Sequence, residues 1–126
     1  MQIKTLLFAA CCLFTVAACH KHEEESNAPV LAILEPLSND SVSGEVHIEG
    51  DVTDESLHEM EIKVTLDADG SQLFLATPEV HDETAYHFHE HWTPTVSVET
   101  AVTLTIIVSD HSDNTTTKTV KFTVKP

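Results

Sequence analysis

Three of the nine histidines in this chain stand at alternate positions of one short segment: His87, His89 and His91. Alternate residues of an extended strand point to the same side, so a strand here would present three imidazoles on one face. Neutral imidazole is the commonest metal ligand in proteins and suits zinc, copper(II) and nickel. We therefore predict a metal site at this segment, with zinc or copper as the candidate ion.

A straight row of three imidazoles cannot close around one ion. Residues on the same face of a strand stand about 6.6–6.8 Å apart from one to the next, so two of the three can converge and a further ligand must come from another strand or loop. His58 and His81 are weaker candidates, and His20 and His22 lie in a charged segment that is typical of a tether. The alternative is a polar or pH-responsive strand face that binds no metal.

The elements that would position these residues are β-strands. From Val30 onward, short alternating segments rich in Val, Ile and Thr are separated by Asn, Asp, Gly, Ser and Pro, and no helical period of useful length occurs. We predict strands near residues 30–35, 44–52, 58–67, 71–76, 84–92, 100–109 and 115–124. About seven strands in a domain of this size predict an all-β antiparallel sandwich.

Within the segment 84–92, Tyr86, Phe88 and Trp92 form the set that we expect to face the core, which leaves the three histidines outside. Glu90 falls on the core side of this pattern, unless a β-bulge turns it outward. The segment Asp67-Ala68-Asp69-Gly70 predicts a hairpin turn in preference to a calcium loop, and residues 110–114 predict a capped turn in preference to a calcium site.

Several segments together resemble bacterial Ig-like domains. The matching segments are Ala28-Pro29-Val30 followed by Ile33 and Pro36, Gly50-Asp51-Val52-Thr53-Asp54, Met60-Glu61-Ile62-Lys63-Val64, His91-Trp92-Thr93 and the closing pair around 104–110 and 113–115. The resemblance implies an Ig-like β-sandwich in which strand B pairs with strand E. The outward residues Glu45, His47 and Glu49 would then lie beside the histidine row, and His47 would complete a site with His87, His89 and His91.

The chain also resembles small His-rich lipoproteins of Bacteroidetes. Lys4 and the apolar run after it have the layout of a secretory signal peptide, and Val16-Ala17-Ala18-Cys19 resembles a lipobox, which implies a lipid on Cys19. We expect a signal peptide at 1–18, a flexible acidic tether at 19–28 and the Ig-like domain at 29–126. Lys21 and the glutamates after it resemble a surface-export signal, although His22 interrupts the usual pattern. Both the cell surface and the periplasmic leaflet of the membrane therefore remain as alternative locations. The expected location is the cell envelope, at the outer membrane.

Composition excludes some partners and chemistries. The formal net charge is -15 and arginine is absent, which disfavours nucleic acid as a partner. All three cysteines lie at or before Cys19, so a metal site must use His, Asp and Glu. The pair His87 and His89 resembles the copper-ligand strand of copper-zinc superoxide dismutase, but the disulfide, the long metal-binding loop and the guiding arginine of that family are missing.

We therefore predict a non-enzymatic, lipid-anchored Ig-like domain that binds a divalent transition metal, with no catalytic residue. Its expected partners are the membrane, through the lipid anchor, and an outer-membrane transporter or another envelope protein. The alternative is a structural, adhesion or transporter-accessory Ig-like lipoprotein without a metal site.

Overall fold

The computed structural model describes residues 27–126. The predicted signal peptide, the lipidated Cys19 and nearly all of the predicted tether lie outside the described residues. The described part is built from eight strands and contains no helix long and apolar enough to cross a membrane. The strands are β1 (Val30–Glu35), β2 (Ser41–Ser43), β3 (Val46–Thr53), β4 (Leu57–Leu66), β5 (Gln72–Ala76), β6 (Ala85–Trp92), β7 (Thr100–Asp110) and β8 (Thr115–Lys125).

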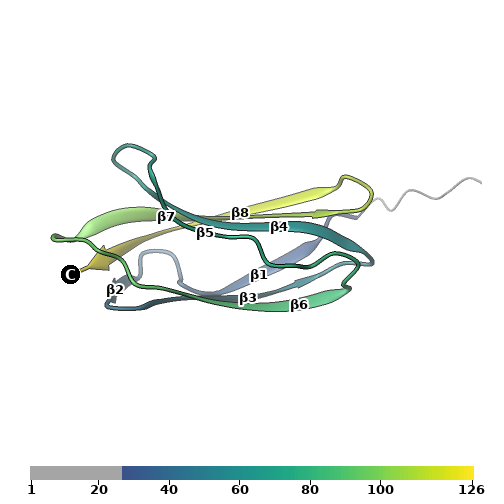
Figure 1. Ribbon diagram of the computed structural model, residues 1–126, viewed down its shortest axis with the longest axis horizontal. Helices are drawn as coiled ribbons and strands as arrows, with labels where there is room; N and C mark the ends of the chain where they lie inside the picture. Colours follow the sequence, from purple (N-terminus) through teal and green to yellow (C-terminus); the bar gives the residue numbers. More distant parts are fainter. Residues whose placement is uncertain (1–26) are drawn as a thin grey trace, which may run out of the picture.

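The strands form two sheets that pack face to face (Figure 1). One sheet has the order β1-β3-β6, and the other has the order β2-β8-β7-β4-β5. Apart from β2, this division of strands places the first, second and fifth long strands opposite the other four. The predicted all-β sandwich is therefore confirmed, and the predicted strand positions agree with the observed ones to within about two residues.

One strand was not expected from the sequence. β2 has three residues and pairs in parallel with β8, whereas the other strand pairs are antiparallel. A tight turn directly precedes β2. In it, Asp40 accepts a hydrogen bond from the Leu37 backbone N–H at 2.8 Å, and Asn39 takes a positive φ of 68°. So short a strand carries too little alternation to be recognised in the sequence.

The core consists of the alternate residues of both sheets. Its largest fully buried side chains are Phe88, Ile48, Leu57, Ile62, Leu104 and Ile106. β3 shows the alternation clearly, because Val46, Ile48, Gly50 and Val52 are buried while the residues between them are not. This pattern leaves every second side chain of β3 and β6 on the outer face of the three-stranded sheet.

Both predicted turns are present. Asp69 accepts a hydrogen bond from the Ser71 backbone N–H at 2.9 Å in the β4–β5 hairpin, where Gly70 has a φ of 73°. In the β7–β8 hairpin, Oδ1 of the buried Asp110 accepts hydrogen bonds from the backbone N–H groups of Ser112 and Asn114 at 2.8 and 2.9 Å. This carboxylate serves the turn, in agreement with the predicted cap.

Candidate metal centre

The histidine row lies on the outer face of β6, as predicted. Phe88 is fully buried, Tyr86 and Trp92 are partly buried against the core, and His87, His89 and His91 are exposed. Glu90 lies on the inward-facing side of β6, because the pairing of β3 with β6 is continuous from Val46 to Thr53 and contains no bulge. The alternation of β6 therefore extends unbroken through the row.

Strand β3 brings a second set of polar side chains beside this row. His47 is paired with His91, Glu49 with His89, and Asp51 with His87. All of these residues lie on the outer face, since their neighbours Ile48 and Val52 are buried. The expected pairing that places His47 beside the histidine row is thus present.

Three imidazoles from these two strands converge. The possible ligand atoms of His47, His89 and His91 all lie within 4.8 Å of one another. Nδ1 of His47 lies 3.1 Å from Nε2 of His89. Two nitrogen ligands of a tetrahedral zinc ion, each about 2.0–2.1 Å from the metal, stand about 3.3–3.4 Å apart, so this pair is already near the required spacing.

Glu45 forms a hydrogen bond with the third imidazole, that of His91. Nδ1 of His91 donates a hydrogen bond to Oε1 of Glu45 at 2.9 Å, and Nε2 of His47 lies 3.4 Å from the same oxygen. The hydrogen bond from His91 lowers the pKa of Glu45, with the charges of His91 and His47 acting in the same direction. A carboxylate bound to one ring nitrogen orients the ring and leaves the other nitrogen available to a metal.

His87 has different partners. Its Nδ1 donates to Asp51 at 2.8 Å, and its Nε2 lies 3.1 Å from Glu49. The hydrogen bond to Asp51 raises the pKa of His87, and the charge of Glu49 adds to this effect, which favours the protonated form that cannot ligate a metal. His87 also lies four residues from His91 along β6, a distance of about 13 Å, so these two imidazoles cannot share one ion. Of the four predicted ligands, the structure therefore brings together His47, His89 and His91, and it places His87 with two carboxylates.

A second group of three histidines was incompletely recognised in the sequence. His58, His81 and His111 also offer ligand atoms within 4.8 Å of one another. His58 and His81 were weaker candidates there, and His111 was not singled out. No local pattern could have found this group, because its members lie far apart in the sequence, at the start of β4, in the β5–β6 connection and directly after β7.

Comparison with known proteins supports the fold alone. No protein-family model matches the chain, and no curated protein matches it. Among solved structures, the crystal structure of an engineered protein is similar, with a TM-score of 0.58 and 16% sequence identity over 78% of this chain. This chain spans only 20% of that protein's length. At this identity the similarity concerns the β-sandwich and carries no function with it.

Proposed function

We propose that this protein binds a divalent transition-metal ion on the outer face of its three-stranded sheet, with His47, His89 and His91 as the protein ligands. The observation that carries this proposal is the convergence of three imidazoles from two paired strands. Two of the ligands sit on one strand at i and i+2, and the third comes from the neighbouring strand, so the continuous register of β3 and β6 sets their spacing.

The donor set selects the class of ion. Imidazole nitrogens favour zinc, copper(II) and nickel over magnesium and calcium, which prefer oxygen ligands. Three protein ligands leave a coordination position open, and the side chain of His47 is 42% exposed, so the ion would exchange with solvent. An open, exposed site suits metal capture or transfer better than a structural role, and the metal is accordingly a ligand of the protein and not part of its fold.

Calorimetric titration of the purified full chain with zinc and with copper at neutral pH tests this proposal. We expect a dissociation constant below about 100 μM and the loss of about one bound equivalent in a His47→Ala and His89→Ala double variant. The matched control is His87→Ala, which removes another exposed imidazole from the same face and should leave binding intact. Affinity weaker than this limit for both ions, or an unchanged number of bound equivalents in the double variant, would overturn the proposal.

We further propose that the domain works as a lipoprotein of the cell envelope, at the outer membrane, beside a transporter or another envelope protein. Support comes from the segment Val16-Ala17-Ala18-Cys19 and the short apolar run before it. Labelling of cells with a palmitate analogue should mark the protein, and Cys19→Ala should abolish the label. A label that survives in the Cys19 variant would contradict lipidation at this residue.

The alternative function is that of an adhesion or accessory module without a metal. Leu34 and Leu37 favour it, because they are 47% and 58% exposed and border a small hollow shared with Glu45 and His47. Exposed apolar side chains that border one hollow are candidates for a contact surface with another protein. If Leu34→Ser and Leu37→Ser abolish co-purification with envelope proteins while zinc titration detects no binding, the accessory role replaces metal binding.

A further inference from the structure

The second histidine group lies at one end of the sandwich, where the β3–β4, β5–β6 and β7–β8 connections meet (Figure 1). His58 is the second residue of β4, His81 lies in the β5–β6 connection, and His111 directly follows β7. The ring centroids of His58 and His111 are 4.6 Å apart, and those of His81 and His111 are 4.7 Å apart. The three imidazoles thus form one compact cluster.

Backbone hydrogen bonds tie these connections together. The Asp82 N–H donates to the Leu57 carbonyl at 2.9 Å, and the Leu57 N–H donates to the Glu83 carbonyl at 2.9 Å. The His111 N–H donates to the Ser56 carbonyl at 3.1 Å. Each histidine is therefore adjacent in sequence to a residue in this network, or belongs to it. A ligand set whose backbone is already in place costs less entropy to order when the ion binds.

The carboxylate of Asp82 contacts two of the three rings, those of His81 and His111. Its Oδ2 lies 3.1 Å from Nδ1 of His81, and its Oδ1 lies 2.9 Å from Nε2 of His111. An imidazole that donates through one nitrogen ligates through the other, and the carboxylate fixes its tautomer and increases its basicity. One aspartate thus orients two of the three rings in the cluster.

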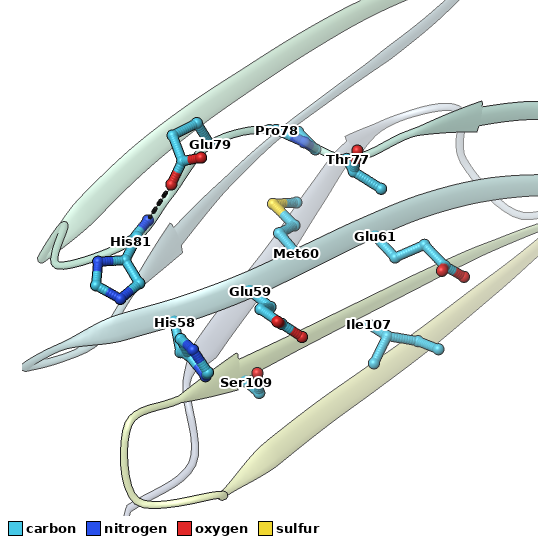
Figure 2. A pocket seen from close by; sticks show the side chains of 10 residues that line it. All are labelled: His58, Glu59, Met60, Glu61, Thr77, Pro78, Glu79, His81, Ile107 and Ser109. Atoms are coloured by element: carbon cyan, nitrogen blue, oxygen red, sulfur yellow. Dashed lines mark hydrogen bonds between the residues drawn. The ribbon is translucent and has the colours of Figure 1, made fainter.

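The cluster borders an acidic hollow of about 590 Å³. His58 and His81 lie at the same end of it, with Glu59 beside His58, as Figure 2 shows. Glu61 and Glu79 also line the hollow, and Glu79 accepts a hydrogen bond from the His81 backbone N–H at 3.2 Å. Carboxylates along an open approach raise the local concentration of cations.

We propose that His58, His81 and His111 form a second divalent transition-metal site, with Asp82 as its positioning residue. This site shares no residue with the His47, His89 and His91 site, so the two proposals can be tested independently. It differs in kind as well, because its ligands come from the start of β4 and from two connections of the sandwich, whereas the other site lies across two paired strands.

Zinc titration of the purified full chain, with binding stoichiometry as the readout, tests the second site. We expect about two equivalents in the wild type and about one in the double variant His81→Ala and His111→Ala. The reciprocal variant, His47→Ala and His89→Ala, should also retain about one equivalent, and combining the four changes should leave none. His20→Ala with His22→Ala is the control for the N-terminal histidines and should keep both sites.

Asp82→Asn tests the positioning role without removing a ligand. Asn accepts the positive φ of 65° found at this position, so the backbone should stay as it is. In the His47→Ala and His89→Ala background we expect zinc affinity to fall about 10- to 100-fold. A Lys118→Ala variant on the exposed part of β8 should leave affinity unchanged in the same background.

Two results would overturn the second site. One is a wild-type stoichiometry that drops to zero in the His47→Ala and His89→Ala variant. The other is a stoichiometry that does not change in the His81→Ala and His111→Ala variant. If that variant loses its β-sheet circular dichroism, anomalous diffraction at the zinc edge on wild-type crystals decides instead. A peak about 2.0–2.1 Å from nitrogens of His58, His81 and His111 supports the site, and no peak at saturating zinc overturns it.

Discussion

His87 and His89 are two residues apart on the same face of β6, and they have different chemical surroundings. His89 Nε2 lies against His47 Nδ1, whereas both ring nitrogens of His87 lie close to carboxylate oxygens. Two facing neutral imidazoles can each direct an unprotonated nitrogen at a metal, whereas the hydrogen bond to Asp51 and the charge of Glu49 raise the pKa of His87 and favour its protonated form. Ligand capacity is thus decided by the partner on β3 and not by residue type.

This difference predicts opposite outcomes for two single substitutions. His89→Ala should weaken zinc binding at the β3–β6 site by at least about tenfold, because one of three imidazoles is removed. His87→Ala should change that affinity by less than about threefold. Competition titration against a zinc-responsive dye, in the His81→Ala and His111→Ala background, measures both values. Equal losses in the two variants would contradict the assignment of ligands.

At the scale of elements, the β7–β8 hairpin depends on Asp110. Burial of its carboxylate would raise the pKa, but hydrogen bonds from the Asn114 side chain and from the Asn114 and Ser112 backbone outweigh burial, and the pKa is lowered. A carboxyl whose pKa is lower in the folded state stabilises the fold above its unfolded pKa of about 3.9 and loses that contribution as pH falls through the folded value.

Asp110→Ala should therefore lower the free energy of unfolding by about 2 kcal/mol at neutral pH, since the backbone N–H groups of Ser112 and Asn114 lose a charged acceptor. The difference from the wild type should shrink as the pH falls below about 4, where the wild-type carboxylate is itself becoming protonated. Urea unfolding of the metal-free protein at several pH values measures this. A deficit that is the same at pH 7 and at about pH 2 would show that the charge of Asp110 does not contribute.

Strand β3 needs a glycine at position 50, where it runs between the neighbouring strands β1 and β6. A Cβ at position 50 would lie 2.2 Å from the Ala32 carbonyl oxygen on β1 and 2.4 Å from Cζ of Phe88 on β6. Neither contact is possible, so the three-stranded sheet would have to shift.

Gly50→Ala should accordingly cost about 3 kcal/mol or more in unfolding free energy, and it should also weaken zinc binding, because the register of β3 and β6 positions the ligands. Gly70→Ala is the matched control: its added Cβ meets nothing within 4 Å, and only its φ of 73° opposes it. That change should cost about 1 kcal/mol and leave zinc affinity unchanged. Equal costs in the two variants, measured by urea unfolding, would contradict the steric account.

At the scale of the whole molecule, the formal net charge of -15 sets the field in which a cation approaches. A field of this sign attracts divalent cations and repels anions, and dissolved salt screens it over about 10 Å at 0.1 M. Zinc association should therefore slow several-fold between about 50 and 500 mM sodium nitrate, a salt whose anion binds zinc weakly. Stopped-flow measurement with the same dye, and a dye-only control at each salt concentration, reports the change. A salt-independent rate would show that the field does not steer the ion.

The β-sandwich and the outward face of the histidine row were predictable because both follow from local alternation. The period of two along β6 places Phe88 inside and His89 outside whatever strand lies next to it. The capped turn at Asp110 was predictable for the same reason, since its hydrogen bonds reach no further than Asn114. β2 was not, because a three-residue strand has no period and exists only through its pairing with β8.

The sequence by itself thus determined which face of each strand is polar, and that imidazoles crowd one of these faces. Only the tertiary structure decided which imidazoles can share an ion. His47 and His89 are 42 residues apart and meet because the core residues of β3 and β6 fix the register between the strands. His58, His81 and His111 meet because backbone hydrogen bonds join three connections at one end of the sandwich. Alternation is a property of a single strand, whereas a ligand set needs contacts between segments that are distant in the chain.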